Sequence, residues 1–574
     1  MCGICGTTGR EDPALAERML RTIRHRGPDS FDLAVSPTSS VGGCRLTIIG
    51  TNTSPLPRAG SPLVLFNGEI YNYRELAADL KVALDPMDAE SHLVQHLLQT
   101  QGAQGIARLQ GMFAIVAVEP DRIVLARDRL GIKPLFYATV NDEVVFGSEM
   151  KAILAHPDVS TALDEQALDE TAVFGYISSP ERTPFACIKQ VPPGTIVEIA
   201  HGRHRVTQYW APQLAESGET GDLGEWATAV RSQLRSGLAQ MLEHDSLEKG
   251  FYLSGGVDSS LLAMLATESQ ARPVLTFTLA DSNDSKDLVA ARRIAESIGS
   301  DHYEFRVGLD EYLRELPVFV QHYENLIAGG VFDIHGGIAF QMLSRNVAKH
   351  VRVAFSGEGA DELFGGYYWP YTHPLGFGET IRSRLAAAGC PPAVAMQVNE
   401  LFPEAEDAAV YRRKVLDFLM QGALANYHLW SVDRSASAFG FEVRPAYLHD
   451  ELVQLALSLP VEAKVLGNHT KRVLKEAARP LYERWGVADL LHRKKSGMPA
   501  AVHGIGAQFE RLASGLVPEQ DVATHPFARW VKSPVEAVMF DLFQYTFVQN
   551  RGTIPTGFEV RDFYESGARA DMYR

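Results

Sequence analysis

The chain has 574 residues, of which 46% are apolar, and its formal net charge is −16 at pH 7. The length allows roughly two to four ordinary domains, and the acidic balance argues against nucleic acid as the main partner. Because no segment approaches the ~20 uninterrupted apolar residues of a membrane span and the N-terminus lacks a secretory pattern, we expect a cytoplasmic protein without a membrane partner.

The first part of the chain, to about residue 210, contains short β-rich runs bounded by Gly, Pro, Asn or Asp, which are typical of strands and turns. The runs are PLVLF (62–66), RIVLA (122–126), EVVFG (143–147) and GTIVEIA (194–200). Their close spacing favours an antiparallel sheet layer over strand–helix–strand crossovers. The polar, Gly-containing residues 211–226 then predict a linker.

Beyond the linker, predicted strands alternate with predicted helices. The strands are GFYL (250–253), VLTFTL (274–279), HYEFRV (302–307) and VRVAF (351–355), and the helices are DSSLLAMLATES (258–269) and DLVAARRIAESIG (287–299). This alternation predicts a parallel, doubly wound sheet, in which ligands bind at the carboxyl ends of the strands. Near the C-terminus, helical spacing predicts a core helix with Val535, Val538, Met539, Leu542 and Phe543 on one face.

The run LSGGVDSS (253–260) lies between a predicted strand and a predicted helix, where backbone N–H groups and the helix dipole attract an anion. Its glycines let the backbone approach closely, and its serine hydroxyls can donate hydrogen bonds. It is not a Walker A loop, because no Lys follows the last Gly. Asp258 would repel phosphate unless a cation lies between them, and Mg²⁺ bound to carboxylates and phosphate oxygens meets that need.

A second Gly-rich acidic turn, FSGEGADELFGGY (355–367), follows its own predicted strand. Its Asp361 could supply the second carboxylate for the same Mg²⁺. Either loop alone could be a tight strand-to-helix turn with a capping Asp. Because each loop follows a predicted parallel strand, the two together favour a site for a Mg²⁺–nucleotide complex.

These two loops resemble a known family. SGGVDSS resembles the pyrophosphate-binding loop of the ATP pyrophosphatases, and its pairing with SGEGADELFGGY resembles the glutamine-dependent asparagine synthetases. In that family a carboxylate attacks the α-phosphate of ATP, pyrophosphate leaves, and ammonia attacks the acyl-AMP.

The resemblance assigns expected roles to residues of this chain. Asp258 and Asp361 would hold Mg²⁺, and Glu358 would support formation of the acyl-adenylate. Lys495, in HRKKSGMP, would neutralise phosphate charge, although an exposed solvating lysine is an alternative. The implied ATP-binding residues are Leu253, Ser254, Gly255, Gly256, Asp258, Ser259, Ser260, Leu279, Ser356 and Gly357.

The chain begins with MCGICGTTGR, which places a cysteine at position 2. Ammonia for amide formation must arrive as NH₃, because ammonium has no lone pair, and its release from glutamine needs a nucleophile. Removal of Met1 would leave Cys2 with a thiol and a free α-amine. The unperturbed pKa of such an amine is ~7.7–8.0, so it can act as the general base for its own thiol.

The runs NGEIYNY (67–73) and GCRLTII (43–49) resemble the glutamine site of class II amidotransferases, which also begin with Cys-Gly-Ile. The resemblance implies an oxyanion hole formed by Asn67 and Gly68, where loss of one donor costs ~10²–10³ in rate. Arg45 would bind the glutamine α-carboxylate through a charge-assisted fork, and Glu69 and Asp88 would bind the α-ammonium. The match extends through HRGPDS (25–30), RDRLGIKPLFY (127–137) and FGSEMKAI (146–153).

The resemblance implies a fold of the α/β and α+β classes in two domains. Residues 2–211 would form a glutaminase with an Ntn-hydrolase-like αββα sandwich, and residues 225–574 a doubly wound ATP-pyrophosphatase domain with helical additions. The expected reaction converts aspartate, glutamine, ATP and water into asparagine, glutamate, AMP and diphosphate, through β-aspartyl-AMP and channelled ammonia. ATP and Mg²⁺ are the expected cofactors, the partners are small molecules, and a homodimer is a possible assembly.

Three stretches depart from the family pattern: PMDAE (86–90), HYENLIAGGVFDIHGG (322–337) and DRSASAFGFEVRPAYLHDE (433–451). The first keeps its Asp and Glu, so Asp88 keeps its expected role. The other two flank the acceptor pocket in the family. Aspartate is the default acceptor, and another carboxylic acid from a specialised biosynthetic pathway is the alternative. A β-lactam-forming relative is disfavoured, because such enzymes need no glutamine-derived ammonia.

Two interpretations from other classes stay open. The chain could be a non-catalytic regulator that binds nucleotide or glutamine, or a thiol or metal protein that uses Cys2 and Cys5. A zinc site needs about four ligands, and no second closely spaced Cys or Cys/His pair is present. The scattered cysteines favour reduced thiols. Synthetase chemistry is favoured by a set of residues present together: Cys2, Asn67, Asp258, Glu358 and Asp361.

Overall fold

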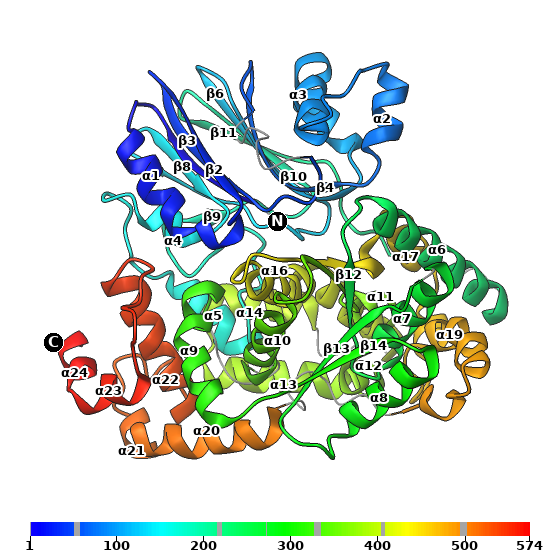
Figure 1. The fold of residues 1–574 in the computed structure, drawn as a ribbon. Coiled ribbons are helices and arrows are strands. Elements are labelled where there is room, and N and C mark those ends of the chain that lie inside the picture. Colours follow the sequence, from blue (N-terminus) through cyan, green and yellow to red (C-terminus); the bar gives the residue numbers. More distant parts are fainter. Residues whose placement is uncertain are drawn as a thin grey trace.

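The computed structural model describes residues 2–50, 58–214, 221–270, 272–326, 334–402, 408–493 and 502–573. These residues form an N-terminal unit of two stacked β-sheets and a C-terminal unit built around a third sheet, with helices packed on each unit (Figure 1). Within these ranges, no helix combines the length and the apolar character needed to cross a membrane.

The antiparallel arrangement expected for the N-terminal part is confirmed, and it takes the form of two sheets. The first has the strand order β2-β3-β1-β8-β7-β9, formed by Ser30–Ser36, Ser39–Arg45, Cys2–Thr8, Glu143–Gly147, Phe136–Val140 and Lys189–Gln190. The second has the order β11-β10-β6-β5-β4, formed by Arg203–Gln208, Thr195–Ala200, Arg122–Arg127, Gly111–Val118 and Leu63–Ile70. Neighbouring strands are antiparallel throughout both sheets.

The two sheets face each other, and helices cover their outer faces (Figure 1). The covering helices are α1 (Pro13–Thr22) and α4 (Met150–Leu154) on the first sheet, and α2 (Tyr73–Leu80) and α3 (Ala89–Gln101) on the second. Side chains alternate along β5, so Phe113 packs with residues of α3 whereas Ala114 packs between the sheets. The apolar character of both faces of β5 therefore follows from the αββα sandwich, which is the expected fold.

The third sheet is parallel, as expected. Its strand order is β14-β13-β12-β15-β16, formed by Asp301–Arg306, Leu275–Ala280, Lys249–Tyr252, Val353–Ser356 and Glu442–Pro445. The helices α7 (Val257–Ser269) and α8 (Lys286–Ile298) follow β12 and β13. From the neighbours β12 and β15 the chain continues toward opposite edges of the sheet, so the turns after these two strands lie at a topological switch point.

Further helical segments connect and surround these sheets. They are η1 (Arg24–Arg26), η2 (Gly102–Arg108), α5 (Glu165–Phe174), α6 (Leu223–Glu243), α9 (Leu309–Tyr323), α10 (Ile334–Val347), α11 (Ala360–Phe364), α12 (Tyr368–Thr372), α13 (Pro374–Ala387), α14 (Pro392–Leu401), α15 (Ala408–Phe418), η3 (Leu419–Leu429), α16 (Trp430–Ser437), η4 (Ala446–Leu448), α17 (Asp450–Ser458), α18 (Val461–Lys464), α19 (Arg472–Arg484), η5 (Ala488–Leu490), α20 (His503–Leu516), α21 (Glu519–Val522), α22 (Pro534–Phe543), η7 (Gln544–Gln549), α23 (Val560–Glu565) and α24 (Ala568–Met572). The predicted boundary at residue 225 falls inside α6, because this helix already begins at Leu223.

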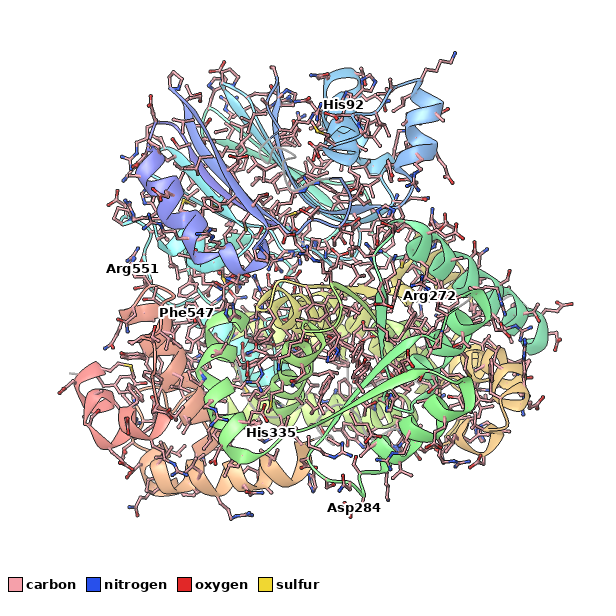
Figure 2. The ribbon with its side chains drawn as sticks, viewed as in Figure 1. His92, Arg272, Asp284, His335, Phe547 and Arg551 are labelled. Carbon is pink, nitrogen blue, oxygen red and sulfur yellow. The ribbon has the colours of Figure 1, made fainter. Side chains whose placement is uncertain are left out.

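The C-terminal helices pack against a loop of the N-terminal part of the chain. The core helix predicted near the C-terminus is α22, which buries Val538, Met539, Leu542 and Phe543. After it, the Phe547 ring lies edge-on to Phe185, with centroids 6.2 Å apart, and Arg551 Nε donates to the Leu154 carbonyl at 2.8 Å (Figure 2). The C-terminal segment thus stabilises the connection between the two units.

A network of buried ion pairs joins the two units. Glu149, which follows β8, is fully buried, and its Oε1 lies 2.9 Å from Arg26 Nη1 and 3.2 Å from Arg434 Nη1. Arg26 Nη1 also lies 2.9 Å from Asp433 Oδ2, and Arg434 Nη2 lies 3.2 Å from Glu324 Oε2. Because Asp433 and Arg434 belong to α16, these pairs link the antiparallel sandwich to the helices of the C-terminal unit.

Two members of this network, Glu149 and Arg26, are held in their charged forms by their neighbours. Burial alone would raise the pKa of the Glu149 carboxyl, but neighbouring cationic groups hold that pKa well below its usual range. Burial would lower the pKa of Arg26, but Asp433 and Glu149 raise it above its usual value. Removing one partner of a buried pair leaves an uncompensated charge, which is strongly destabilising. The network therefore opposes separation of the two units.

We predict that Arg434→Met lowers the free energy of unfolding by about 3–5 kcal/mol, because Glu149 and Glu324 lose a buried counter-charge. Arg21→Met is the matched control, since the Arg21–Glu17 pair has side chains 70% and 54% exposed. Its effect should stay below about 1 kcal/mol. Urea unfolding measures both variants, and equal stability of the two would contradict the role given to the network.

Candidate active sites

Cys2 is the first residue of β1 and lies opposite Arg45 of β3 in the antiparallel register. Its backbone N–H donates to Asn67 Oδ1 at 2.9 Å. Its carbonyl accepts a hydrogen bond from Arg26 Nε at 3.1 Å, which connects it to the ion-pair network between the units. Cys2 is partly exposed, whereas Cys5 is fully buried. Two polar groups therefore hold the backbone of Cys2, while its side chain stays accessible.

Asn67 and Gly68 lie on β4 beside Cys2, where the sequence predicts an oxyanion hole. The Asn67 Oδ1 is occupied by Cys2, whereas its Nδ2 is buried and has no hydrogen-bond partner among the described residues. Gly68 has φ +147°, and a Cβ there would lie 2.0 Å from the Met112 carbonyl oxygen, so no larger residue fits. A buried donor without a partner costs free energy, and the Asn67 Nδ2 is a donor of the kind that the expected oxyanion hole requires.

Arg45 and Asp88 lie close to each other, as expected for residues that bind the two charged groups of an amino acid. Arg45 Nη1 is 3.9 Å from Asp88 Oδ1, and Arg45 Nη2 donates to the Ile49 carbonyl at 2.8 Å. Arg58 Nη1 is 3.3 Å from Asp88 Oδ2 and was not recognised in the sequence. The Arg45 Nε is buried without a partner among the described residues.

The carboxylate of Glu69 points elsewhere, toward the C-terminal unit. Its Oε2 lies 2.7 Å from His244 Nε2 and 3.7 Å from Arg444 Nη2. Burial lowers the pKa of His244, but hydrogen bonds to Glu69 and Glu90 outweigh burial and raise that pKa to about 9. These contacts place the Glu69 carboxylate at the interface between the units, and its expected contact with a glutamine ammonium stays a prediction.

The two Gly-rich turns meet at the switch point of the third sheet. A Cβ on Gly357 would lie 3.0 Å from the Asp258 Cβ, so the turns touch. Gly255 has φ +68°, and its backbone packs against α8, where a Cβ would lie 2.6 Å from the Ala290 Cβ. The Ser254 N–H donates to Ser259 Oγ at 3.1 Å, which fixes the first turn. The sequence therefore predicted correctly that these two loops would lie together.

Lys471 lies between the two carboxylates expected to bind metal, and the sequence gave no signal for it. Its Nζ is 2.5 Å from Asp258 Oδ2 and 2.6 Å from Asp361 Oδ1. Lys471 has a left-handed backbone, with φ 53°, immediately before α19. Such a conformation costs of order 1–3 kcal/mol in a non-glycine residue and is frequent at functional sites.

The donor set at this point fits Mg²⁺. The Asp258 Oδ1 is buried and has no hydrogen-bond partner among the described residues, and the Lys471 ammonium supplies positive charge to both carboxylates. Asp258 and Asp361 would hold the ion, since Mg²⁺ prefers carboxylate and phosphate oxygens.

The other expected residues of the nucleotide site lie on the same turns or on adjacent strands. Leu253, Leu279 and Ser356 are buried at the ends of β12, β13 and β15. Glu358 is on the second turn with a side chain 29% exposed. Lys495 lies outside the described residues.

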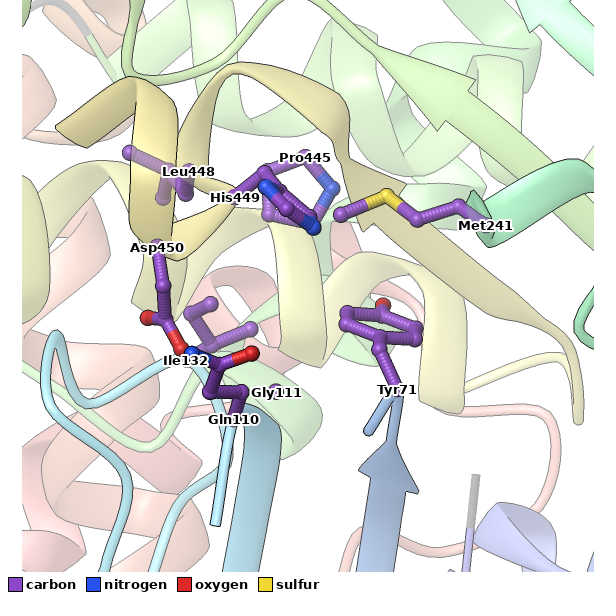
Figure 3. A pocket seen from close by; sticks show the side chains of 9 residues that line it. All are labelled: Tyr71, Gln110, Gly111, Ile132, Met241, Pro445, Leu448, His449 and Asp450. Carbon is purple, nitrogen blue, oxygen red and sulfur yellow. The ribbon is translucent and has the colours of Figure 1, made fainter. Parts of the chain in front are cut away.

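A small cavity lies between the two units (Figure 3). Its volume is about 10 Å³, as the space open to the centre of a water-sized sphere; one water molecule needs roughly 10–15 Å³ on this measure. The N-terminal unit contributes Tyr71, Gln110, Gly111 and Ile132, and the C-terminal unit contributes Met241, Pro445, Leu448, His449 and Asp450. The interface is thus closely packed around a space of molecular size.

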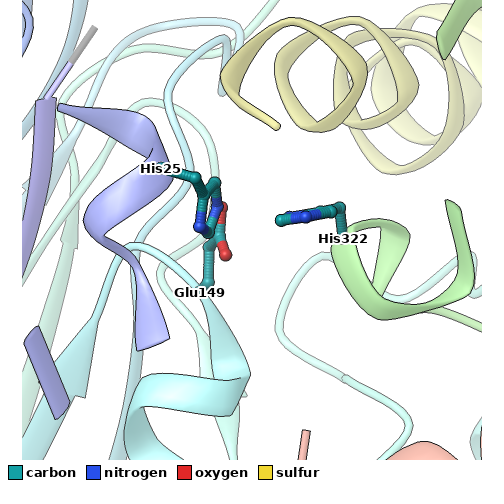
Figure 4. A group of neighbouring side chains, drawn as sticks. All are labelled: His25, Glu149 and His322. Atoms are coloured by element: carbon teal, nitrogen blue, oxygen red, sulfur yellow. The ribbon is translucent and has the colours of Figure 1, made fainter. Parts of the chain in front are cut away.

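Two groups of His and carboxylate side chains in the described part of the chain lie close enough to hold a metal ion. One is Glu69, Glu90 and His244, and the other is His25, Glu149 and His322 (Figure 4). In the second group, His25 Nε2 lies 3.0 Å from Glu149 Oε1. Because Arg26, Lys151 and Arg434 already surround this carboxylate, a divalent cation would meet three positive charges. We assign no metal there.

Comparisons with known proteins agree with the two units. Residues 1–210 match the family described as glutamine amidotransferase domain, and residues 229–529 match the family described as asparagine synthase. A solved structure titled as the allosteric regulatory enzyme of purine biosynthesis matches with a TM-score of 0.30 at 13% identity, covering 55% of this chain and 91% of that one.

Curated relatives are similar over most of their length. Asparagine synthetase [glutamine-hydrolyzing] 1 of Bacillus subtilis (strain 168) is 27% identical, covering 90% of each chain. A putative asparagine synthetase [glutamine-hydrolyzing] of Mycobacterium bovis is 28% identical, covering 87% of this chain and 86% of the relative. Asparagine synthetase [glutamine-hydrolyzing] 3 of Arabidopsis thaliana is 27% identical, covering 86% and 78%.

We predict that Lys471→Met lowers the midpoint of thermal unfolding in metal-free buffer, because Asp258 and Asp361 lose their shared cation. Added Mg²⁺ or Mn²⁺ should restore it, by about 2.7 kcal/mol of stability at 100 times the dissociation constant. Lys475→Met, one turn further along α19, is the control and should respond to metal as the unchanged chain does. An equal metal response in all three proteins would contradict a metal site at these carboxylates.

Proposed function

Because this chain belongs to the asparagine synthase family, we propose that it is a glutamine-hydrolysing, ATP-dependent amide synthetase with aspartate as its acceptor. The observation that carries the proposal is the arrangement at Cys2, whose N–H is held by Asn67 Oδ1 while the Asn67 Nδ2 stays buried without a partner. A structural asparagine would use both groups. A second site, at the switch point of the parallel sheet, supplies the acids that nucleotide activation needs.

Glutamine hydrolysis would proceed at Cys2 after removal of Met1. The α-amine accepts the thiol proton, and the sulfur attacks the amide carbon of glutamine. The Asn67 Nδ2 and the backbone N–H of Gly68 stabilise the oxyanion, and NH₃ leaves with the proton that the amine returns. Water then releases glutamate from the thioester. Arg45 and Asp88 would hold the α-carboxylate and the α-ammonium of glutamine.

Acceptor activation would take place at the Gly-rich turns after β12 and β15. The acceptor carboxylate attacks the α-phosphorus of ATP and pyrophosphate leaves, which produces an acyl-adenylate. Mg²⁺, when bound, neutralises phosphate charge. Asp258 and Asp361 would hold that ion, Lys471 would move from these carboxylates toward the phosphates, and the backbone of the first turn would bind the leaving pyrophosphate.

Ammonia would pass between the sites inside the molecule. Ammonia that reached water near pH 7 would be protonated and lost as a nucleophile. The ion-paired side chains at the interface are buried, and the cavity of Figure 3 is close to the size of one water or ammonia molecule. Both features support transfer through the interface.

The acceptor is the finer part of the proposal. Residues 433–451 form one of the stretches that depart from the family pattern, and two of them lie at the interface between the units. Asp433 pairs with Arg26. His449 lines the cavity, and its Nε2 lies 2.6 Å from Gln240 Oε1. The change at His449 thus has a place at the interface between the units, and aspartate remains the default acceptor. In the other stretch that departs from the family pattern, 322–337, residues 327–333 lie outside the described residues. A screen of carboxylic acids for pyrophosphate release should select L-aspartate, and selection of another acid would establish the alternative.

We predict that Cys2→Ala abolishes the use of glutamine but leaves amide formation from added ammonium, because the nucleophile serves only the first step. Cys5→Ala, three residues further along β1 and fully buried, is the matched control and should keep both activities. Asp258→Asn should give the reverse result: loss of pyrophosphate release with glutamine hydrolysis retained. Simultaneous loss of both activities in well-folded Cys2→Ala would contradict the division of labour.

A further inference from the structure

A chain of polar side chains lies behind Glu358. His428 Nδ1 is 3.8 Å from Glu358 Oε2, and on the other side of the ring His428 Nε2 is 2.8 Å from the Tyr367 hydroxyl. The Tyr367 hydroxyl in turn lies 2.5 Å from Glu362 Oε1. These contacts connect Glu358, on the second Gly-rich turn, to His428 of η3. They continue through Tyr367 to Glu362 of α11.

The hydrogen bonds among these four side chains favour one tautomer of His428 over the other. A carboxylate can only accept, so the Tyr367 hydroxyl donates its proton to Glu362. The oxygen of Tyr367 then accepts from His428 Nε2–H at 2.8 Å. Because the hydrogen bond at one ring nitrogen determines the state of the other, Nδ1 carries a lone pair that is directed toward Glu358.

Burial increases from Glu358 through His428 to Glu362. The side chain of Glu358 is 29% exposed, that of His428 is 15% exposed, and that of Glu362 is 1% exposed. A buried carboxylate such as Glu362 favours a positive charge nearby, and His428 Nε2 lies 3.4 Å from its Oε1. An imidazolium at position 428 would therefore be stabilised by carboxylates on both sides.

The ring of His428 is held in place by its neighbours. Tyr367 stacks on it with centroids 5.7 Å apart, and Tyr427 lies edge-on at 4.8 Å. Within the described part of the chain, the titratable groups seen to face it are Glu358, Glu362, Tyr367 and Tyr427. His428 lies in a π-helical segment, Leu419–Leu429, and such segments are frequent at functional sites.

We propose that His428 is a positioning residue for Glu358 that also takes up the proton released during amide formation. The inference rests on the proposed function. Ammonia forms a bond to the acyl carbon, the bond from that carbon to the phosphate oxygen breaks, and AMP leaves with the electron pair. The nitrogen must also lose one proton. Glu358 accepts it and passes it to His428 Nδ1, which becomes an imidazolium between two carboxylates until the proton returns to solvent.

The first test needs no turnover and therefore does not depend on the identity of the acceptor. NMR of histidine side chains labelled with ¹³C and ¹⁵N, with His428 assigned through its loss in His428→Gln, reports its tautomer and its pKa. The neutral ring should carry its proton on Nε2. Glu358→Gln should lower the pKa of His428 by about one unit, because the imidazolium loses a neighbouring negative charge. A proton on Nδ1, or an unchanged pKa in Glu358→Gln, would overturn the proposal.

The second test separates the two half-reactions, with L-aspartate as acceptor and ammonium chloride as nitrogen source. His428→Gln should lower kcat for amide formation ~10–100-fold, a part of the 10²–10⁴ typical of acid–base catalysis. Aspartate-dependent exchange of pyrophosphate into ATP should change by less than about two-fold. His373→Gln, at an exposed position, is the control with unchanged rates.

The outcomes of this second test remain distinguishable. Equal loss of exchange and amide formation in His428→Gln would show a structural role and overturn the proposal, as would unchanged rates in that variant. If the unchanged chain catalyses no exchange with aspartate, the acceptor assignment of the proposed function is wrong, and the NMR measurement decides the role of His428.

Discussion

The contact between the two units depends on charge pairing among buried side chains. Glu149 receives Arg26 from the sandwich and Arg434 from α16, and Arg26 in turn binds the carbonyl of Cys2. Removing any one of these charged side chains would leave an uncompensated charge in a buried environment. The contact between the units and the position of Cys2, the proposed nucleophile, are therefore stabilised by the same interactions.

Both candidate sites are marked by buried polar groups that lack a partner within the described part of the chain. In the site at Cys2 this group is the donor Asn67 Nδ2, and in the site at the Gly-rich turns it is the acceptor Asp258 Oδ1. Such groups are costly unless a ligand or a reacting atom completes them. Lys471 has a related role, because it supplies charge to two acids that would otherwise repel each other.

Much of the architecture could be predicted because it depends on local signals. Short apolar runs predicted β4, β6, β8 and β10, and alternation with helices predicted the parallel sheet and hence the meeting of its two Gly-rich turns. The position of Lys471 could not be predicted, because it lies 213 residues from Asp258 in the sequence. Its left-handed backbone conformation is also not indicated by any motif. Glu69 shows the opposite limit: its motif is intact, but its carboxylate binds His244, a partner from the other unit.

The central claim is that the α-amine and the thiol of Cys2 form the nucleophile that releases ammonia. Mass spectrometry of the intact active protein, before and after treatment with a diazoketone analogue of glutamine, tests it directly. The account predicts a chain without Met1 that gains one adduct, located on Cys2, as glutamine hydrolysis is lost. Retention of Met1 in material that hydrolyses glutamine at full rate, or inactivation with the adduct on another residue, would contradict it.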